Sequence, residues 1–62
     1  MSEWAYLEYV NADEKAMLIG YCLTNSIPYE VATTNDGYFT MRFWLSKVQR
    51  KDLQNYINIM FI

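Results

Sequence analysis

The chain of 62 residues contains no histidine, a single cysteine, two glycines and one proline. Without histidine it lacks the side chain that most often acts as a general base or a metal ligand near neutral pH. Cys22 has no second cysteine with which to form a disulfide and no partner at the spacing of zinc ligands. We therefore expect no metal and no cofactor, and so neither the disulfides nor the structural metal that stabilise many very small domains.

Residues for other kinds of catalysis are also scarce. Two glycines cannot form a phosphate-binding glycine loop. A nucleophile needs a base beside it, whereas Cys22 lies in an apolar segment, as a packed core cysteine would. The carboxylates are scattered, and a helix start explains the adjacent Asp13 and Glu14. The sequence thus predicts that this protein is not an enzyme.

Long apolar runs are absent as well. No segment approaches the roughly 18 consecutive apolar residues of a membrane span. The N-terminal "MSEW" is acidic and no apolar run follows it, which predicts no signal peptide and no membrane partner. A lone cysteine is typical of a reducing compartment, so we expect a cytoplasmic location.

Apolar residues, by contrast, make up 53% of the chain and aromatic residues 18%. This composition argues against disorder, and the length predicts a single domain spanning residues 1–62. A chain of this size buries only about 60% of its unfolded surface and is marginally stable alone. Without disulfide or metal, we expect either dense packing or self-association.

The charges are divided unevenly along a chain whose net charge is −2. Residues 1–36 carry six acids and one base, a net charge of −5, and residues 37–62 carry four bases and one acid, a net charge of +3. The acidic total disfavours nonspecific binding of nucleic acid. The asymmetry fits either a basic binding patch or two halves that face each other, within one chain or between subunits. Lys47, Arg50 and Lys51 are accordingly either a solvated helix face or a docking patch for an acidic surface.

Three segments rich in aromatic and β-branched residues predict strands. They are "WAYLEYV" at 4–10, "YEVATT" at 29–34 and "YFTMRFWL" at 38–45. The "NDG" at 35–37 predicts a tight hairpin between the last two, because Gly37 tolerates the positive φ of such a turn.

Two capping boxes, Asn11 with Glu14 and Ser46 with Gln49, predict where the helices begin. Asn25 is expected to end the first helix in a left-handed conformation. The helices are expected over residues 12–24 and 47–60, with apolar faces made of Ala12, Ala16, Ile19, Gly20 and Leu23 in the first and Leu53, Tyr56, Ile57 and Met60 in the second. The glycine within the first face suggests a close approach of the helix to a strand.

The order β-α-β-β-α resembles a ferredoxin-like βαββαβ domain without its last strand. The resemblance implies an α+β fold with a three-stranded antiparallel sheet, strand order 2-3-1, and both helices on one face. Alternation along the strands then assigns side chains to the two faces. The helix-facing set is Ala5, Leu7, Tyr9, Tyr29, Val31, Thr33, Phe39, Met41, Phe43 and Leu45.

The opposite face of the sheet is the candidate binding surface. Its expected members are Trp4, Tyr6, Glu8, Glu30, Ala32, Thr34, Tyr38, Thr40, Arg42 and Trp44. Two tryptophans and two tyrosines without a covering helix are more apolar surface than a monomer normally exposes. We therefore predict a protein partner that binds at Trp4, Tyr6, Glu8, Tyr38, Arg42 and Trp44.

A second consequence of the topology is an exposed edge. The first strand has no partner on one side, and a long aromatic edge favours pairing with another chain. The apolar C-terminal "INIMFI" is a further candidate contact. We predict a homodimer or higher homo-oligomer that uses Trp4, Tyr6, Glu8, Val10, Phe61 and Ile62.

An alternative is the binding of single-stranded nucleic acid. RNA-recognition domains stack bases on aromatic side chains of a sheet with related topology. Tyr6 together with Tyr38 or Trp44, with Arg42 nearby, offers similar chemistry. However, "DGYFTMRFW" is only loosely similar to their motif. Glu8 and Glu30 on the same face would also repel phosphate, so the protein partner is favoured.

In size and composition the chain resembles the accessory inhibitors that phages and other mobile elements encode. The resemblance implies a protein that blocks a host or defence enzyme sterically, in the host cytoplasm if it is phage-encoded. The blocking surface would be the aromatic patch (Trp4, Tyr6, Tyr38, Trp44) or an acidic end (Glu3, Glu8, Asp13, Glu14). A purely structural homo-oligomer is the third hypothesis.

Overall fold

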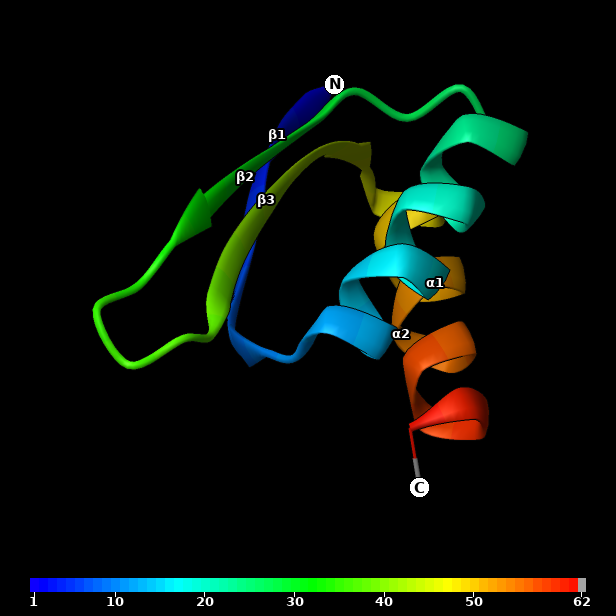
Figure 1. The fold of residues 1–62 in the computed structure, drawn as a ribbon. Coiled ribbons are helices and arrows are strands. Elements are labelled where there is room, and N and C mark those ends of the chain that lie inside the picture. The colour runs from blue at the N-terminus through cyan, green and yellow to red at the C-terminus, as the bar shows by residue number, and fades with distance from the viewer. Residues whose placement is uncertain (62) are drawn as a thin grey trace.

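A computed structural model describes residues 1–61 and has the element order β-α-β-β-α (Figure 1). The elements are β1 (Ser2–Val10), α1 (Ala12–Thr24), β2 (Tyr29–Thr33), β3 (Phe39–Ser46) and α2 (Lys47–Met60). The predicted order is confirmed, and the boundaries agree with the expected ones within two residues. The agreement follows from local signals, since turns and helix caps set most of these boundaries.

The three strands form one antiparallel sheet in the order β1-β3-β2, so the predicted topology is confirmed. Both helices lie on the same side of the curved sheet, and the β2–β3 hairpin extends beyond them (Figure 1). The helices pack chiefly against the central strand β3. Both β1 and β2 are therefore edge strands, and the second lies largely outside the helical cover.

The core forms between β3 and the two helices. Its buried members are Val10, Leu18, Cys22, Ile27, Met41, Phe43, Leu45 and Leu53. Met41, Phe43 and Leu45 alternate along β3 and all face the helices, as predicted, while Phe39 is half-buried at the strand's start. At about 25 cal/mol for each Å² of apolar surface removed from water, these side chains supply most of the folding free energy.

Both predicted capping boxes are present. The amide of Glu14 donates to Asn11 Oδ1 at 2.8 Å, and the amide of Gln49 donates to Ser46 Oγ at 3.2 Å. In return the Glu14 and Gln49 side chains accept from the cap amides, each at 3.0 Å. The hairpin is also confirmed, with φ of 86° at Gly37.

The end of α1 differs from the prediction. Asn25 keeps a negative φ of −103°, and Ser26 takes the left-handed conformation with φ of 55°. The amide of Ile27 then donates to the carbonyl oxygen of Cys22 at 2.9 Å, which closes the helix end. The stop lies one residue later because this position brings Ile27 into the core, where it is 4% exposed.

The predicted apolar face of α1 is wrong except at Ile19, which packs against the core. Leu18 and Cys22 are buried, whereas Leu23 is 69% exposed and Ala12, Ala16 and Gly20 face solvent. The helix is rotated so that Tyr21 contacts Tyr56 of α2, with ring centroids 4.6 Å apart. A Cβ at Gly20 would meet nothing within 4 Å, so no close approach to a strand explains this glycine.

Two further expectations are corrected, one at the end of β1 and one at the end of α2. Tyr9 does not face the helices: a bulge between Leu7 and Val10 gives it a φ of 58° and leaves it 69% exposed. Val10 enters the core in its place, because the extra residue of a bulge reverses the alternation. In α2, Met60 is exposed, and Phe61 packs against the core instead.

Candidate functional site

The sheet face opposite the helices carries a stack of aromatic and charged side chains at the N-terminal end of β1. Trp4 lies directly opposite Trp44 in the β1–β3 register, and their rings meet edge to face with centroids 5.2 Å apart. Such pairs add roughly 0.5–1.5 kcal/mol beyond the area they bury. The two side chains are therefore held in one arrangement before any partner arrives.

Arg42 extends this stack across the sheet. Its guanidinium lies 4.2 Å from the centre of the Trp4 ring and donates a hydrogen bond to the carboxylate of Glu30 on β2. Glu30 and, to a lesser extent, Tyr6 raise the pKa of Arg42 through hydrogen bonds. Because Tyr6 and Glu30 lie opposite Arg42 on the two flanking strands, one row of side chains crosses all three strands. We call Trp4, Tyr6, Glu30, Arg42 and Trp44 the tryptophan cluster.

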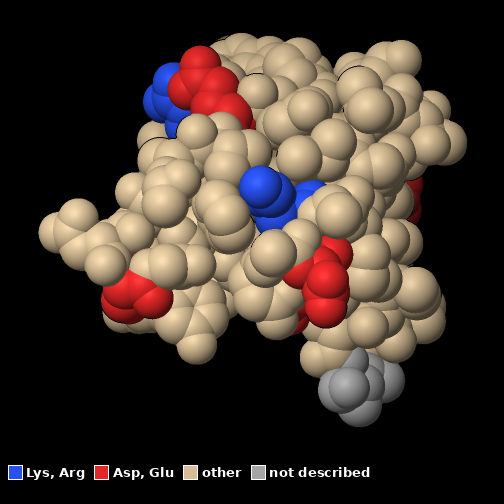
Figure 2. Space-filling view, in the orientation of Figure 1, with Lys and Arg blue, Asp and Glu red and all other residues tan. Residues whose placement is uncertain are grey.

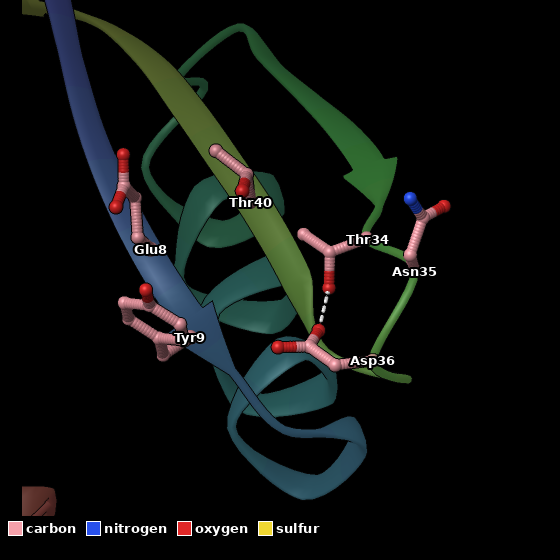
Figure 3. A pocket seen from close by; sticks show the side chains of 6 residues that line it. All are labelled: Glu8, Tyr9, Thr34, Asn35, Asp36 and Thr40. Carbon is pink, nitrogen blue, oxygen red and sulfur yellow. Dashed lines mark hydrogen bonds between the residues drawn. The ribbon is translucent and has the colours of Figure 1, made fainter.

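A second group lies at the other end of the same face, beside the hairpin loop. Tyr9 and Tyr38 meet edge to face with ring centroids 6.2 Å apart. Next to them is an open hollow of about 350 Å³ lined by Glu8, Tyr9, Thr34, Asn35, Asp36 and Thr40 (Figure 3). We call these residues, together with Tyr38, the hairpin cluster.

The loop side of the hairpin cluster is held by local hydrogen bonds. The Thr34 hydroxyl donates to the Asp36 carboxylate (Figure 3) and also lies 3.0 Å from the carbonyl oxygen of Tyr38. The Thr34 hydroxyl and the backbone amide of Tyr38 lower the pKa of the exposed Asp36 carboxyl. Asp36 therefore stays charged at neutral pH.

The predicted partner-binding residues thus divide between two clusters. Trp4, Tyr6, Arg42 and Trp44 belong to the tryptophan cluster, while Glu8 and Tyr38 belong to the hairpin cluster. Tyr38 and Trp44 are six positions apart in the sequence, which is about 20 Å along an extended strand. One small partner element would contact one cluster or the other, and only a broad partner surface would cover both.

Six members of these clusters were not among the predicted partner-binding residues: Tyr9, Glu30, Thr34, Asn35, Asp36 and Thr40. Two of them, Glu30 and Tyr9, show what the sequence could and could not reveal. Glu30 was placed on the correct face, and the hairpin register could have identified it as the partner of Arg42. Tyr9 was assigned to the core because strict alternation places it there. Nothing in the local sequence signals the bulge that turns its side chain outward.

The residues predicted for self-association differ in how exposed their side chains are. Tyr6 and Glu8 are exposed on edge strand β1, and Trp4 is half-buried there. The Val10 side chain is buried, so this residue can contact another chain only through its backbone. Phe61 packs partly against the core, and Ile62 lies outside the described residues.

The basic residues of α2 lie together on the surface of that helix. Lys47, Arg50 and Lys51 line a shallow surface hollow on α2, and Arg50 lies 3.3 Å from the carboxylate of Glu3. On the face shown in Figure 2, blue and red side chains lie in small separate groups with uncharged surface between them. The partial pairing fits a solvated helix face, and the docking alternative stays a prediction.

Features that would indicate chemistry are few among residues 1–61. Burial raises the pKa of the Cys22 thiol to about 11, so it stays protonated at neutral pH. No three His, Cys, Asp or Glu side chains of the described residues gather as metal ligands. None of the helices in this part of the chain has the length and apolar character needed to span a membrane. Comparison with known protein families, curated proteins and solved structures finds no match for this chain.

Proposed function

We propose that this chain is a small, non-enzymatic protein-binding module that self-associates and docks its partner on the tryptophan cluster. The observation that supports the proposal is the Trp4–Trp44–Arg42 stack on a sheet face that no helix covers. Tryptophan, tyrosine and arginine are the residue types that dominate binding energy at protein interfaces. Their mutual contacts also reduce the entropy that binding would otherwise cost.

The charge of this surface indicates the chemistry of the partner. Arg42 is paired with Glu30 within the molecule, so the cluster presents a nearly neutral, aromatic surface. It suits an apolar or aromatic patch with a few hydrogen-bonding groups better than a strongly charged one. By its resemblance in size and composition to phage-encoded accessory inhibitors, the module would cover the functional surface of a host or defence enzyme in the cytoplasm and block it sterically.

Affinity capture with three forms of the protein tests this proposal. The forms are the wild type, Trp44→Ala and the control Leu23→Ala, which removes an exposed apolar side chain from α1. We expect a partner that the wild type and the control retain and that Trp44→Ala loses, although it is still folded by circular dichroism. Identical captured proteins for all three forms would contradict docking on the tryptophan cluster.

Single-stranded nucleic acid is the second candidate ligand, because Tyr6 is 64% exposed beside Arg42. A base could stack there, but Glu30 competes with phosphate for the guanidinium. Binding of a fluorescent oligonucleotide at about 50 mM salt tests this candidate, since phosphate-driven affinity is greatest at low salt. Binding that Tyr6→Ala abolishes would favour nucleic acid, and no binding would remove this candidate.

A further inference from the structure

The free edge of β2 is the least covered part of the sheet. Four of its five residues are exposed, and Val31, whose side chain points to the helix side, is still 38% exposed. The two helices pack chiefly on β3, and Tyr29 is the residue of β2 that packs against the core. Beyond Tyr29, this strand therefore has open space beside its edge and over both faces.

The backbone groups that point to this edge can be identified. The amide of Trp44 donates to the carbonyl oxygen of Pro28 at 2.9 Å, and the amide of Thr34 donates to the carbonyl oxygen of Tyr38 at 2.8 Å. Backbone groups alternate in direction along an antiparallel strand. The amides and carbonyls of Tyr29, Val31 and Thr33 consequently point away from β3.

Edge strand β2 also lacks the usual protection against pairing. Bulges and unpaired charges keep strand edges from joining other chains. All five residues of β2 pair in unbroken register with β3, so the strand is regular. Its only charge, on Glu30, is neutralised by Arg42 on the neighbouring strand. Pro28 closes only the end of the strand, where pairing would stop in any case.

We propose that β2 pairs in antiparallel orientation with β2 of a second copy, centred on Val31. This inference rests on the self-association in the proposed function and assigns it to β2. In this register Val31 lies opposite its own copy and Tyr29 lies opposite Thr33, which gives about six new backbone hydrogen bonds from three hydrogen-bonded pairs.

Charge selects this register and favours a second copy as the occupant. With the centre at Val31, Glu30 lies opposite Ala32, whereas a shift to a centre at Glu30 would place two carboxylates directly opposite each other. Like charges in that position are destabilising. The strand is thus self-complementary, with a pair of β-branched side chains at its centre. The product is a continuous six-stranded sheet with all helices on one face and both tryptophan clusters on the other.

Substitutions at Val31 test the proposal because they leave the β2–β3 ladder intact. Val31→Pro removes an amide that points to the free edge, where proline is tolerated. Val31→Thr is the matched control, since it keeps the amide, the β-branch and nearly the same volume. Val31→Lys is the second variant, which changes no backbone group and would place two cations opposite each other.

Sedimentation equilibrium should show twice the monomer mass for the wild type and Val31→Thr. For Val31→Pro and Val31→Lys, the dimer dissociation constant should rise at least about tenfold, since two central hydrogen bonds are lost or two like charges meet. A wild type that stays monomeric, or a folded Val31→Pro that dimerises as well as the control, would overturn the proposal. Trp44-dependent partner capture should persist in Val31→Pro, so failure of the edge pairing is distinct from failure of partner docking.

Discussion

The two edge strands of this small sheet differ in how they are protected. Edge strand β1 is long, but it is interrupted by the bulge at Tyr9 and carries Glu8 beside the bulge, while Glu3 at its other end is paired with Arg50. Edge strand β2 is short and regular, and its one charge is neutralised. From this difference we expect regularity and unpaired charge, as much as length and aromatic content, to decide which edge pairs with another chain.

The bulge also links edge protection to the binding face. It brings Val10 into the core and turns Tyr9 outward to meet Tyr38. One local irregularity therefore interrupts the edge of β1 and brings Tyr9 into the hairpin cluster. Edge strand β2 has no such irregularity, so its backbone stays available.

The largest predicted effect comes from a substitution in the central strand β3, against which both edge strands pair. Phe43 is 1% exposed at the centre of β3, opposite Ala5 on β1 and Tyr29 on β2. Phe43→Ala should cost about 3–5 kcal/mol, which equals the whole stability expected of a core this small. We expect an unfolded chain by circular dichroism and NMR dispersion. Val48→Ala, at an exposed site on α2, should change stability by less than about 0.5 kcal/mol; a folded Phe43→Ala would contradict the assigned core.

A smaller change loosens the β2 hairpin alone. Gly37 has a φ of 86°, which a side chain strains, so Gly37→Ala should lower the free energy of unfolding by about 1–2 kcal/mol. Gly20→Ala is the matched control within an exposed part of α1 and should raise it by about 1 kcal/mol. Urea unfolding measures both. If both variants changed the free energy of unfolding in the same direction, one of these backbone assignments would be wrong.

The protected edge can be tested through the bulge itself. Tyr9 holds a φ of 58°, so Tyr9→Gly should relieve about 1–2 kcal/mol of backbone strain. This gain offsets the entropy cost of glycine and the loss of the Tyr38 ring contact, so the free energy of unfolding should stay roughly unchanged. Tyr9→Val should lower it, because a β-branched residue is poorly suited to positive φ. If valine were tolerated as well as glycine in thermal unfolding, the bulge would not exist in solution.

The smallest predicted effect is a pH dependence of the β2–β3 loop. Hydrogen bonds from Thr34 and the backbone lower the pKa of Asp36 in the folded state. The stabilisation is therefore present above the ordinary aspartate pKa of about 3.9 and is lost as the pH falls through the lower folded pKa. Melting temperatures between pH 6 and pH 3 should fall slightly more for the wild type than for Asp36→Asn. An identical pH dependence would exclude this contribution.

Much of the fold could be predicted because the deciding signals are local. Asn11 with Glu14 and Ser46 with Gln49 set the helix starts through contacts between residues three apart, and Gly37 set the hairpin turn. The rotation of α1 could not be predicted, because it depends on Tyr21 meeting a residue of α2 that lies 35 positions away in the sequence. Sequence spacing allowed two faces on this helix, and tertiary packing chose between them.

The sequence predicted which residues belong to the candidate site better than it predicted how they are arranged. Alternation placed Trp4, Arg42 and Trp44 on one face, but their stacking follows from the β1–β3 register, which is a long-range property. Tyr9 was misplaced because a bulge leaves no local pattern. The importance of the β2 edge also depends on the helices' position over β3, which the sequence does not specify.

Backbone amide exchange, followed by NMR at low and high protein concentration, tests the contrast between the edges most directly. In the monomer, the amides of Val31 and Thr33 on β2, and those of Trp4 and Tyr6 on β1, all point away from β3 by the alternation of the ladder. We predict that protection of Val31 and Thr33 rises at least about tenfold with concentration, while that of Trp4 and Tyr6 does not change. Protection that rises at Trp4 and Tyr6 instead, or at neither edge, would contradict pairing through β2.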